Sequence, residues 1–143
     1  MKTAFWDSSA LLPLCVPRRD KAGALRQLLN DYPPVVWWSS PVEVASAMER
    51  LRRRGELSPE ECAASRQRLA ELRLSWREIQ PTMRLRGLAD ACLSRFDLRA
   101  ADALQLAAAL IWCREAPGGR AFLCCDRRLS QTASEAGFSV LAP

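Results

Sequence analysis

The stretch on which the fold depends reads Lys2-Thr3-Ala4-Phe5-Trp6-Asp7-Ser8-Ser9-Ala10-Leu11-Leu12. The short apolar run before Asp7 contains two aromatic residues and predicts a buried strand. The apolar run that follows predicts a helix, with Ser8 or Ser9 as its cap. Asp7 therefore lies between two apolar segments. Because burying an unpaired carboxylate costs free energy, we expect Asp7 either to cap a helix or to bind a ligand.

The composition is that of a folded, modestly basic protein. The 143 residues are 49% hydrophobic and 26% charged, and the net charge is +5. These values exclude a disordered chain, and the length favours a single domain over residues 1–143. Only Lys2 and Lys21 are lysines, so nearly all the positive charge is arginine. This excess is compatible with a polyanionic partner such as RNA, and equally with a genome biased towards arginine codons.

The chain contains no histidine. This excludes Ser-His-Asp and Cys-His triads, histidine-ligated zinc and histidine as a general base. Hydrolysis would have to use carboxylates, a metal ion, or a cysteine without its usual partner. The cysteines form no Cys-x-x-Cys pair, and we interpret them as small buried side chains in a reducing compartment. They are Cys15, Cys62, Cys92, Cys113, Cys124 and Cys125.

Two features predict a cytoplasmic protein without a membrane span. The N-terminal apolar run is interrupted by Asp7 and is too short for a signal peptide. The uncharged stretch at 103–113 is too short to cross a bilayer. We therefore expect no membrane partner.

Apolar runs and turn signals predict strands that alternate with helices. Strands are expected at 2–6, 35–38, 76–79, 121–125 and 138–141. Longer helices are expected at 18–30, 41–54, 58–73, 82–95, 99–115 and 127–136. This alternation is typical of the α/β class, with a central, mainly parallel five-stranded sheet and helices on both faces. The strands lack a polar side, as in sheets that are covered on both faces.

Four acids fall at the expected carboxyl edge of this sheet, where open parallel sheets bind ligands. Asp7 and Asp126 end predicted strands, and Glu43 and Asp102 lie in the first turns of predicted helices. Each acid alone is also explained as a helix cap or as a partner of the helix dipole. Four acids together repel one another unless a cation binds between them. Oxygen ligands without histidine or paired thiolates favour Mg²⁺, with Mn²⁺ as the other possibility.

With these acids in place, the sequence resembles the PIN-domain ribonucleases, and within them the VapC-like toxins of bacterial toxin–antitoxin pairs. The resemblance covers nearly the whole chain. It rests on four segments in order, at 5–12, 41–47, 98–107 and 123–129. Two departures stand out: Gln105 replaces a histidine found in many members, and Ala101 replaces a hydroxyl or proline found in some. Neither departure removes an acid.

The resemblance implies a PIN-domain fold with Asp7, Glu43, Asp102 and Asp126 as its catalytic acids. Asp7, Asp102 and Asp126 would be direct or water-mediated metal ligands. Glu43 would hold a metal-bound water or help to fill a second metal site. Ser9 would orient Asp7 or the scissile phosphate, although a role as helix cap explains it as well.

The implied activity is Mg²⁺-dependent endoribonucleolytic cleavage that leaves a 5′-phosphate and a 3′-hydroxyl. The implied partners are an RNA substrate, a cognate antitoxin whose tail covers the acidic site, and a second copy of the chain in a homodimer. Arg127 and Arg128 follow Asp126 directly and are our candidates for substrate binding. We interpret the other arginine clusters as solvated helix faces.

Three other classes of protein are alternatives to a PIN-domain ribonuclease. A haloacid-dehalogenase-type phosphotransferase also carries an aspartate after its first strand, but needs a second aspartate where Ser9 lies and a later lysine. A response-regulator receiver needs the same lysine, and this chain has none after Lys21. A non-catalytic PIN-like module that binds RNA or protein is the remaining alternative. The intact set of four acids argues against it, because such a module need not keep them.

Overall fold

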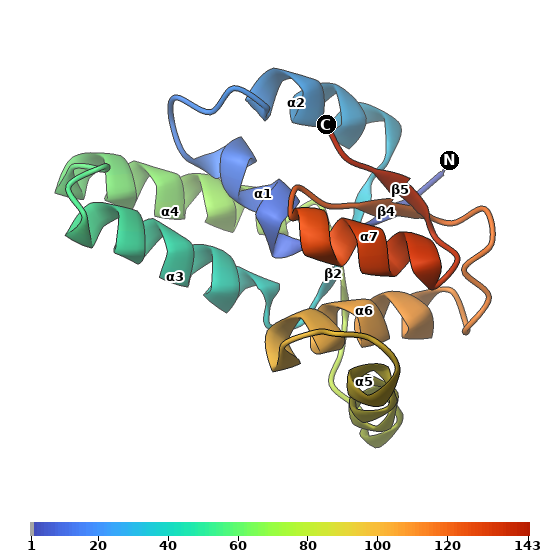
Figure 1. Ribbon diagram of the computed structural model, residues 1–143. Coiled ribbons are helices and arrows are strands. Elements are labelled where there is room, and N and C mark those ends of the chain that lie inside the picture. Colours follow the sequence, from blue (N-terminus) through green and yellow to red (C-terminus); the bar gives the residue numbers. More distant parts are fainter. Residues whose placement is uncertain (1) are drawn as a thin grey trace.

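A computed structural model describes residues 2–143 (Figure 1). Its centre is one five-stranded sheet with the strand order β3-β2-β1-β4-β5, in which every neighbouring pair is parallel. The strands are β1 (Ala4–Trp6), β2 (Pro34–Trp37), β3 (Arg77–Ile79), β4 (Ala121–Leu123) and β5 (Ser139–Leu141). The predicted α/β class and five-stranded sheet are confirmed, and the sheet is parallel throughout.

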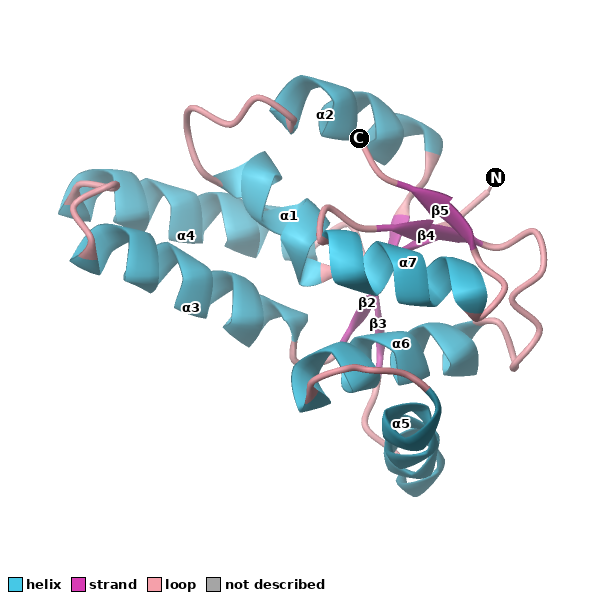
Figure 2. Ribbon diagram, viewed as in Figure 1, coloured by secondary structure: helices cyan, strands magenta, loops and turns pink. Residues whose placement is uncertain are grey.

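Helices cover both faces of the sheet, as predicted (Figure 2). On one face lie α1 (Ser8–Cys15), α2 (Ala22–Asp31), α3 (Ser40–Arg53) and α4 (Pro59–Arg73). On the other lie α5 (Met83–Arg95), α6 (Ala100–Trp112) and α7 (Arg127–Glu135). No helix among residues 2–143 is long and apolar enough to span a membrane.

Two helix boundaries differ from those predicted by more than one residue, and backbone conformation explains both. The helix predicted at 18–30 begins only at Ala22, because Arg18 has a φ of 62°. The helix predicted at 99–115 ends at Trp112, because Arg114 and Glu115 have φ values of 53° and 58°. Residues in this left-handed region cannot continue a right-handed helix.

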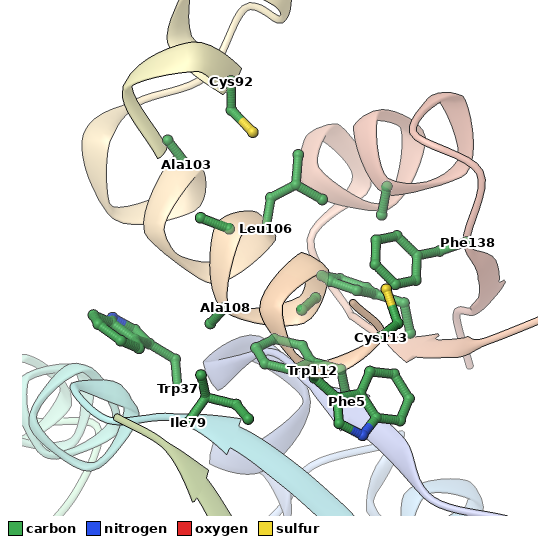
Figure 3. Close-up of a cluster of buried hydrophobic side chains, with 14 of the residues drawn as sticks. Phe5, Trp37, Ile79, Cys92, Ala103, Leu106, Ala108, Trp112, Cys113 and Phe138 are labelled. Atoms are coloured by element: carbon green, nitrogen blue, oxygen red, sulfur yellow. The ribbon is translucent and has the colours of Figure 1, made fainter. Parts of the chain in front are cut away.

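Alternating side chains of the strands supply two separate apolar layers. Phe5 points towards α5, α6 and α7 and stacks on Phe122, with 5.4 Å between the ring centroids. Trp6 points to the opposite layer, against the first four helices. Figure 3 shows the first of these layers, where Ala108 lies on the side of α6 nearer Trp37 and Ile79, and Leu106 extends from the opposite side of the helix. All six cysteines are free thiols and five are buried, as predicted.

The first helix is capped by one of the residues proposed from the sequence. The cap of α1 is Asp7 rather than Ser8 or Ser9, which both lie inside the helix. Asp7 has an extended backbone, and its carboxylate accepts a hydrogen bond from the Ser9 amide. Asp126 caps α7 in the same way, through the Leu129 amide. An aspartate between a strand and the next helix is well placed to satisfy the free N–H groups of that helix.

The central strand creates a topological switch point at the carboxyl edge of the sheet. The chain passes from β1 to β2 on one side, whereas β4 lies on the other side of β1. The Asp7 amide donates to the Leu123 carbonyl at 2.9 Å and joins the ends of β1 and β4. The crevice outside such a point is where open parallel sheets bind ligands.

Candidate active site

The four predicted acids come together at this edge. Asp7 follows β1, Asp126 follows β4, and Glu43 and Asp102 lie in the first turns of α3 and α6. Their charges act on one another: Asp102 interacts with both Asp7 and Asp126, and Glu43 interacts with Asp7 and Asp102. Residues from four separate segments of the chain therefore share one electrostatic environment.

Asp7 is the most buried of the four, with 3% of its surface exposed. Its Oδ2 accepts hydrogen bonds from the Ser9 hydroxyl at 2.5 Å and from the Ser9 amide at 3.1 Å. Burial raises the pKa of Asp7 above its ordinary value, the Ser9 hydrogen bonds lower it, and the Asp102 charge raises it again. A buried carboxylate in this balance gains stability from a cation placed beside it.

Ser9 connects three parts of the site. Its hydroxyl oxygen donates to Asp7 and also accepts a 2.9 Å hydrogen bond from the Cys125 amide. The side chain therefore fixes the Asp7 carboxylate relative to the loop after β4. This contact is compatible with the orienting role for Ser9, which stays a prediction, while the cap of α1 is Asp7 itself.

Glu43 is half-buried and is held by hydrogen bonds to a single oxygen. Its Oε2 accepts from Gln105 Nε2 at 2.8 Å and from the Ser39 hydroxyl at 3.2 Å. Burial and the Asp7 charge raise the pKa of Glu43 to about 7, and the two hydrogen bonds partly oppose that rise. The other oxygen, Oε1, faces no hydrogen-bond donor of the described chain. It remains available to a water molecule.

Asp102 and Asp126 form the more accessible side of the cluster. Burial and the Asp126 charge raise the pKa of Asp102, whereas the charges of Arg128 and Arg99 lower it. Asp126 is exposed and uses Oδ1 for the Leu129 amide, 2.9 Å away. A cation from solvent would reach these two carboxylates first.

Arg127 and Arg128, the two arginines after Asp126, differ in their contacts. Arg128 approaches Asp97 at 3.6 Å, and its charge also acts on Asp102. Arg127 is exposed and has no ion pair within residues 2–143. Both lie beside the acids, so their predicted substrate contacts are compatible with their positions but remain predictions.

The donor set fits a hard divalent cation. All four side chains offer carboxylate oxygens, and none forms an ion pair with a basic residue of the described chain. Their mutual repulsion is the situation that Mg²⁺ or Mn²⁺ relieves. Nevertheless, no three acidic or cysteine side chains among residues 2–143 already lie close enough together to hold a metal ion. Binding would therefore need the carboxylates to draw closer.

Two polar residues of the site were missed as functional residues in the sequence. Gln105 appeared only as a departure from the family, yet it is fully buried and donates to both Glu43 and Ser40. Its Oε1 has no hydrogen-bond partner in residues 2–143. A sequence signal existed, because Gln105 lies one helical turn after Asp102 and so shares its face of α6.

Cys124 was interpreted only as a buried side chain. Its sulfur lies 3.7 Å from Asp7 Oδ2 and 3.4 Å from the Asp126 amide nitrogen. Burial, reinforced by the Asp7 charge, raises the pKa of Cys124 to about 12. The thiol therefore stays protonated at neutral pH and donates to the Asp7 carboxylate instead of competing with it for a metal.

Comparisons with known proteins agree with this fold. No protein-family profile and no curated protein sequence matches the chain. Among solved structures, VapC20 of Mycobacterium tuberculosis, a sarcin–ricin loop cleaving toxin, superposes with a TM-score of 0.70. At 21% identity, the match covers 99% of this chain and 100% of VapC20. A chain of a toxin–antitoxin complex from Klebsiella pneumoniae matches with a TM-score of 0.64 and 15% identity, covering 90% and 91% of the two chains.

These similarities define the class of fold. The chain has the PIN-domain fold of VapC toxins, with an all-parallel five-stranded sheet and seven helices in the described residues. The predicted resemblance to VapC-like proteins is confirmed in the fold.

Proposed function

We propose that this protein is a Mg²⁺-dependent endoribonuclease and the toxin of a toxin–antitoxin pair. The observation that carries the proposal is the group of four carboxylates at the switch point, none of them in an ion pair with a basic side chain of the described chain. The proposal is supported by the fold shared with VapC20, a sarcin–ricin loop cleaving toxin. The net charge of +5 is compatible with an RNA substrate.

Each acid has a separate task in the proposed reaction. Asp7, Asp102 and Asp126 hold the ion, and Ser9 keeps Asp7 in one orientation. When bound, Mg²⁺ supplies Lewis acidity that lowers the pKa of water and neutralises charge on the phosphodiester. Glu43 orients the attacking water through Oε1, because Oε2 is already occupied by Gln105 and Ser39. A pKa near neutrality suits Glu43 to accept a proton from that water.

The proposed protein partner is an antitoxin whose tail covers the acidic edge. A basic side chain of the antitoxin would neutralise the carboxylates and occupy the position of the ion. The neighbour from Klebsiella pneumoniae, a toxin–antitoxin complex, supports this partner. We also propose a homodimer, on the family resemblance alone; light scattering of the purified protein tests it.

The deciding experiment is cleavage of structured RNAs by the purified protein. We expect products with 5′-phosphates in Mg²⁺ or Mn²⁺ and none after addition of a chelator. Asp7→Asn is expected to abolish cleavage while its circular dichroism spectrum stays that of the wild type. Cleavage that persists in the chelator, or in Asp7→Asn, would reject the metal mechanism. Metal-independent RNA binding without cleavage would instead favour the non-catalytic binding module.

A further inference from the structure

A hollow opens beside the acids, along one face of α3. Its volume is about 500 Å³. The face of α3 that lines it carries Glu43, Ser46, Ala47 and Arg50, which recur at helical spacing. Ser8 of α1 and residues from the starts of α3 and α6, namely Ser39, Val42 and Ala101, complete the walls. The hollow therefore begins at the catalytic edge and continues along the surface of the helix.

The walls suit a phosphate backbone. Glu43 is their only acid, and the small side chains leave room for a strand to enter. The Ser8 and Ser46 hydroxyls are able to donate to phosphate oxygens, whereas the Ser39 hydroxyl already donates to Glu43. The volume lies within the range of pockets that hold a small ligand, so a single nucleotide fits and a duplex does not.

Arg50 is the cation of this hollow. It is exposed and has no acidic partner within the described chain, 2–143. Its neighbour Arg52 is bound to Glu49 at 2.8 Å, and Arg66 of α4 approaches the same glutamate at 3.2 Å. The guanidinium of Arg50 is thus the one at this hollow that remains available for an external anion.

The spacing along α3 fits a substrate strand that passes over Glu43. Arg50 lies seven positions after Glu43, which corresponds to about 10 Å along the helix axis. An arginine at this distance, on the same face, reaches a phosphate that flanks the cleaved bond rather than the cleaved bond itself.

We infer that this hollow is the subsite for the single-stranded RNA that flanks the cleaved bond, with Arg50 as its phosphate contact. The inference rests on the proposed function, because it takes the reaction to occur at the four acids. It assigns Arg50 to substrate binding, separately from the predicted contacts of Arg127 and Arg128.

A second hollow offers the RNA strand an alternative route along the surface. It has a volume of about 770 Å³, lies between α3 and α4, and is lined by Arg53, Arg66 and Arg73. Val42 and Ser46 line both hollows, but Glu43 lines only the smaller one. A strand that leads from the acids is therefore expected to follow the smaller hollow.

Binding of a labelled single-stranded RNA, followed by fluorescence anisotropy at several salt concentrations, tests the inference. The measurements use the Asp7→Asn background, in which cleavage is expected to stop. Adding Arg50→Ala should weaken binding about tenfold, since a charge-assisted hydrogen bond is lost. The slope of log affinity against log salt should fall by about 0.7, the value for one phosphate contact on a single strand. Arg50→Lys should retain part of the affinity.

Arg26→Ala is the matched control, because Arg26 is also exposed on a helix but lies on α2. It removes the same charge and should leave the affinity and the salt slope nearly unchanged. Equal losses in Arg50→Ala and Arg26→Ala would overturn the inference, as would a loss confined to Arg73→Ala. Arg50-dependent binding by a wild-type protein that cleaves no RNA would leave the subsite standing and reject the nuclease.

Discussion

Gln105 on α6 donates a 2.8 Å hydrogen bond to Glu43 on α3, across 62 residues of sequence. The same amide nitrogen donates to the Ser40 hydroxyl at 3.0 Å. The side chain is fully buried and joins the second turn of α6 to the first turn of α3, two helices on opposite faces of the sheet. This hydrogen bond holds Glu43 through Oε2 and leaves Oε1 available to a water molecule.

The first prediction concerns this bond. Gln105→Leu keeps the approximate size of the side chain but leaves Glu43 and Ser40 without their donor. We expect kcat to fall by about 10-fold to 100-fold, as for other residues that orient an active-site ligand. Because the Gln105 hydrogen bond lowers the pKa of Glu43, its loss should also move the acidic limb of the pH–rate profile to higher pH. Gln105→His, which restores an N–H donor, should recover part of the activity. An unshifted profile in Gln105→Leu would contradict this role.

The second prediction is a pH dependence of stability in the metal-free protein. Folding raises the pKa of Glu43 from 4.5 to about 7, so between these values the folded state binds the proton more tightly than the unfolded state does. The stability contributed by this proton is complete below pH 4.5 and is lost as the pH rises through 7. The pKa values of Asp7 and Asp102 are raised in the same direction.

Urea unfolding in a chelator at pH 5 and pH 8 measures this effect. The wild type should be more stable at pH 5, and Glu43→Gln should lose less stability on going to pH 8. Thermal unfolding of the two proteins provides a second readout. Parallel pH profiles for wild type and Glu43→Gln would show that the Glu43 carboxyl does not titrate in this range.

The third prediction is stabilisation by metal. A ligand that binds only the folded state adds about 2.7 kcal/mol at one hundred times its Kd, which raises the Tm by several degrees for a chain of this size. We therefore expect Mg²⁺ and Mn²⁺ to raise the Tm at pH 8. Asp102→Asn should remove most of the increase. Asp90→Asn on α5, which removes an acid away from the site, should keep it. An equal increase in all three proteins would point to a non-specific salt effect.

The fourth prediction concerns Ser9. Ser9→Ala removes the hydroxyl that donates to Asp7 and accepts from the Cys125 amide. A partly buried amide then loses its partner, which typically costs about 1–3 kcal/mol of unfolding free energy. The pKa of Asp7 should rise further, so half-maximal activity should need more Mg²⁺ at neutral pH. Ser9→Thr, which keeps the hydroxyl, serves as the control for both readouts. Wild-type stability in Ser9→Ala would argue against the bridging role.

The positions of the four acids followed from local sequence because each lies where an apolar run meets a helix start. Asp7 directly follows β1 and Asp126 lies between β4 and α7, and both positions are set by the change from apolar to polar residues. From the sequence alone, each aspartate is explained either as a helix cap or as a cation ligand. In the structure both aspartates cap helices and also lie beside the other acids. A carboxylate has two oxygens and is able to serve both purposes.

The sequence by itself determined the alternation of strands and helices, the α/β class and the residue types that suit a hard cation. These properties depend on hydrophobic periodicity and on neighbours within a few residues. The tertiary structure alone decided the strand order β3-β2-β1-β4-β5, the bond from Gln105 to Glu43 and the placing of Cys124 beside Asp7. It also decided that Arg50 lies in the hollow beside the acids without an ion pair to any residue of 2–143, while Arg52 pairs with Glu49. Such contacts join residues far apart in the chain, and they arise only when the two apolar faces of the sheet are covered and the helix starts meet at one edge.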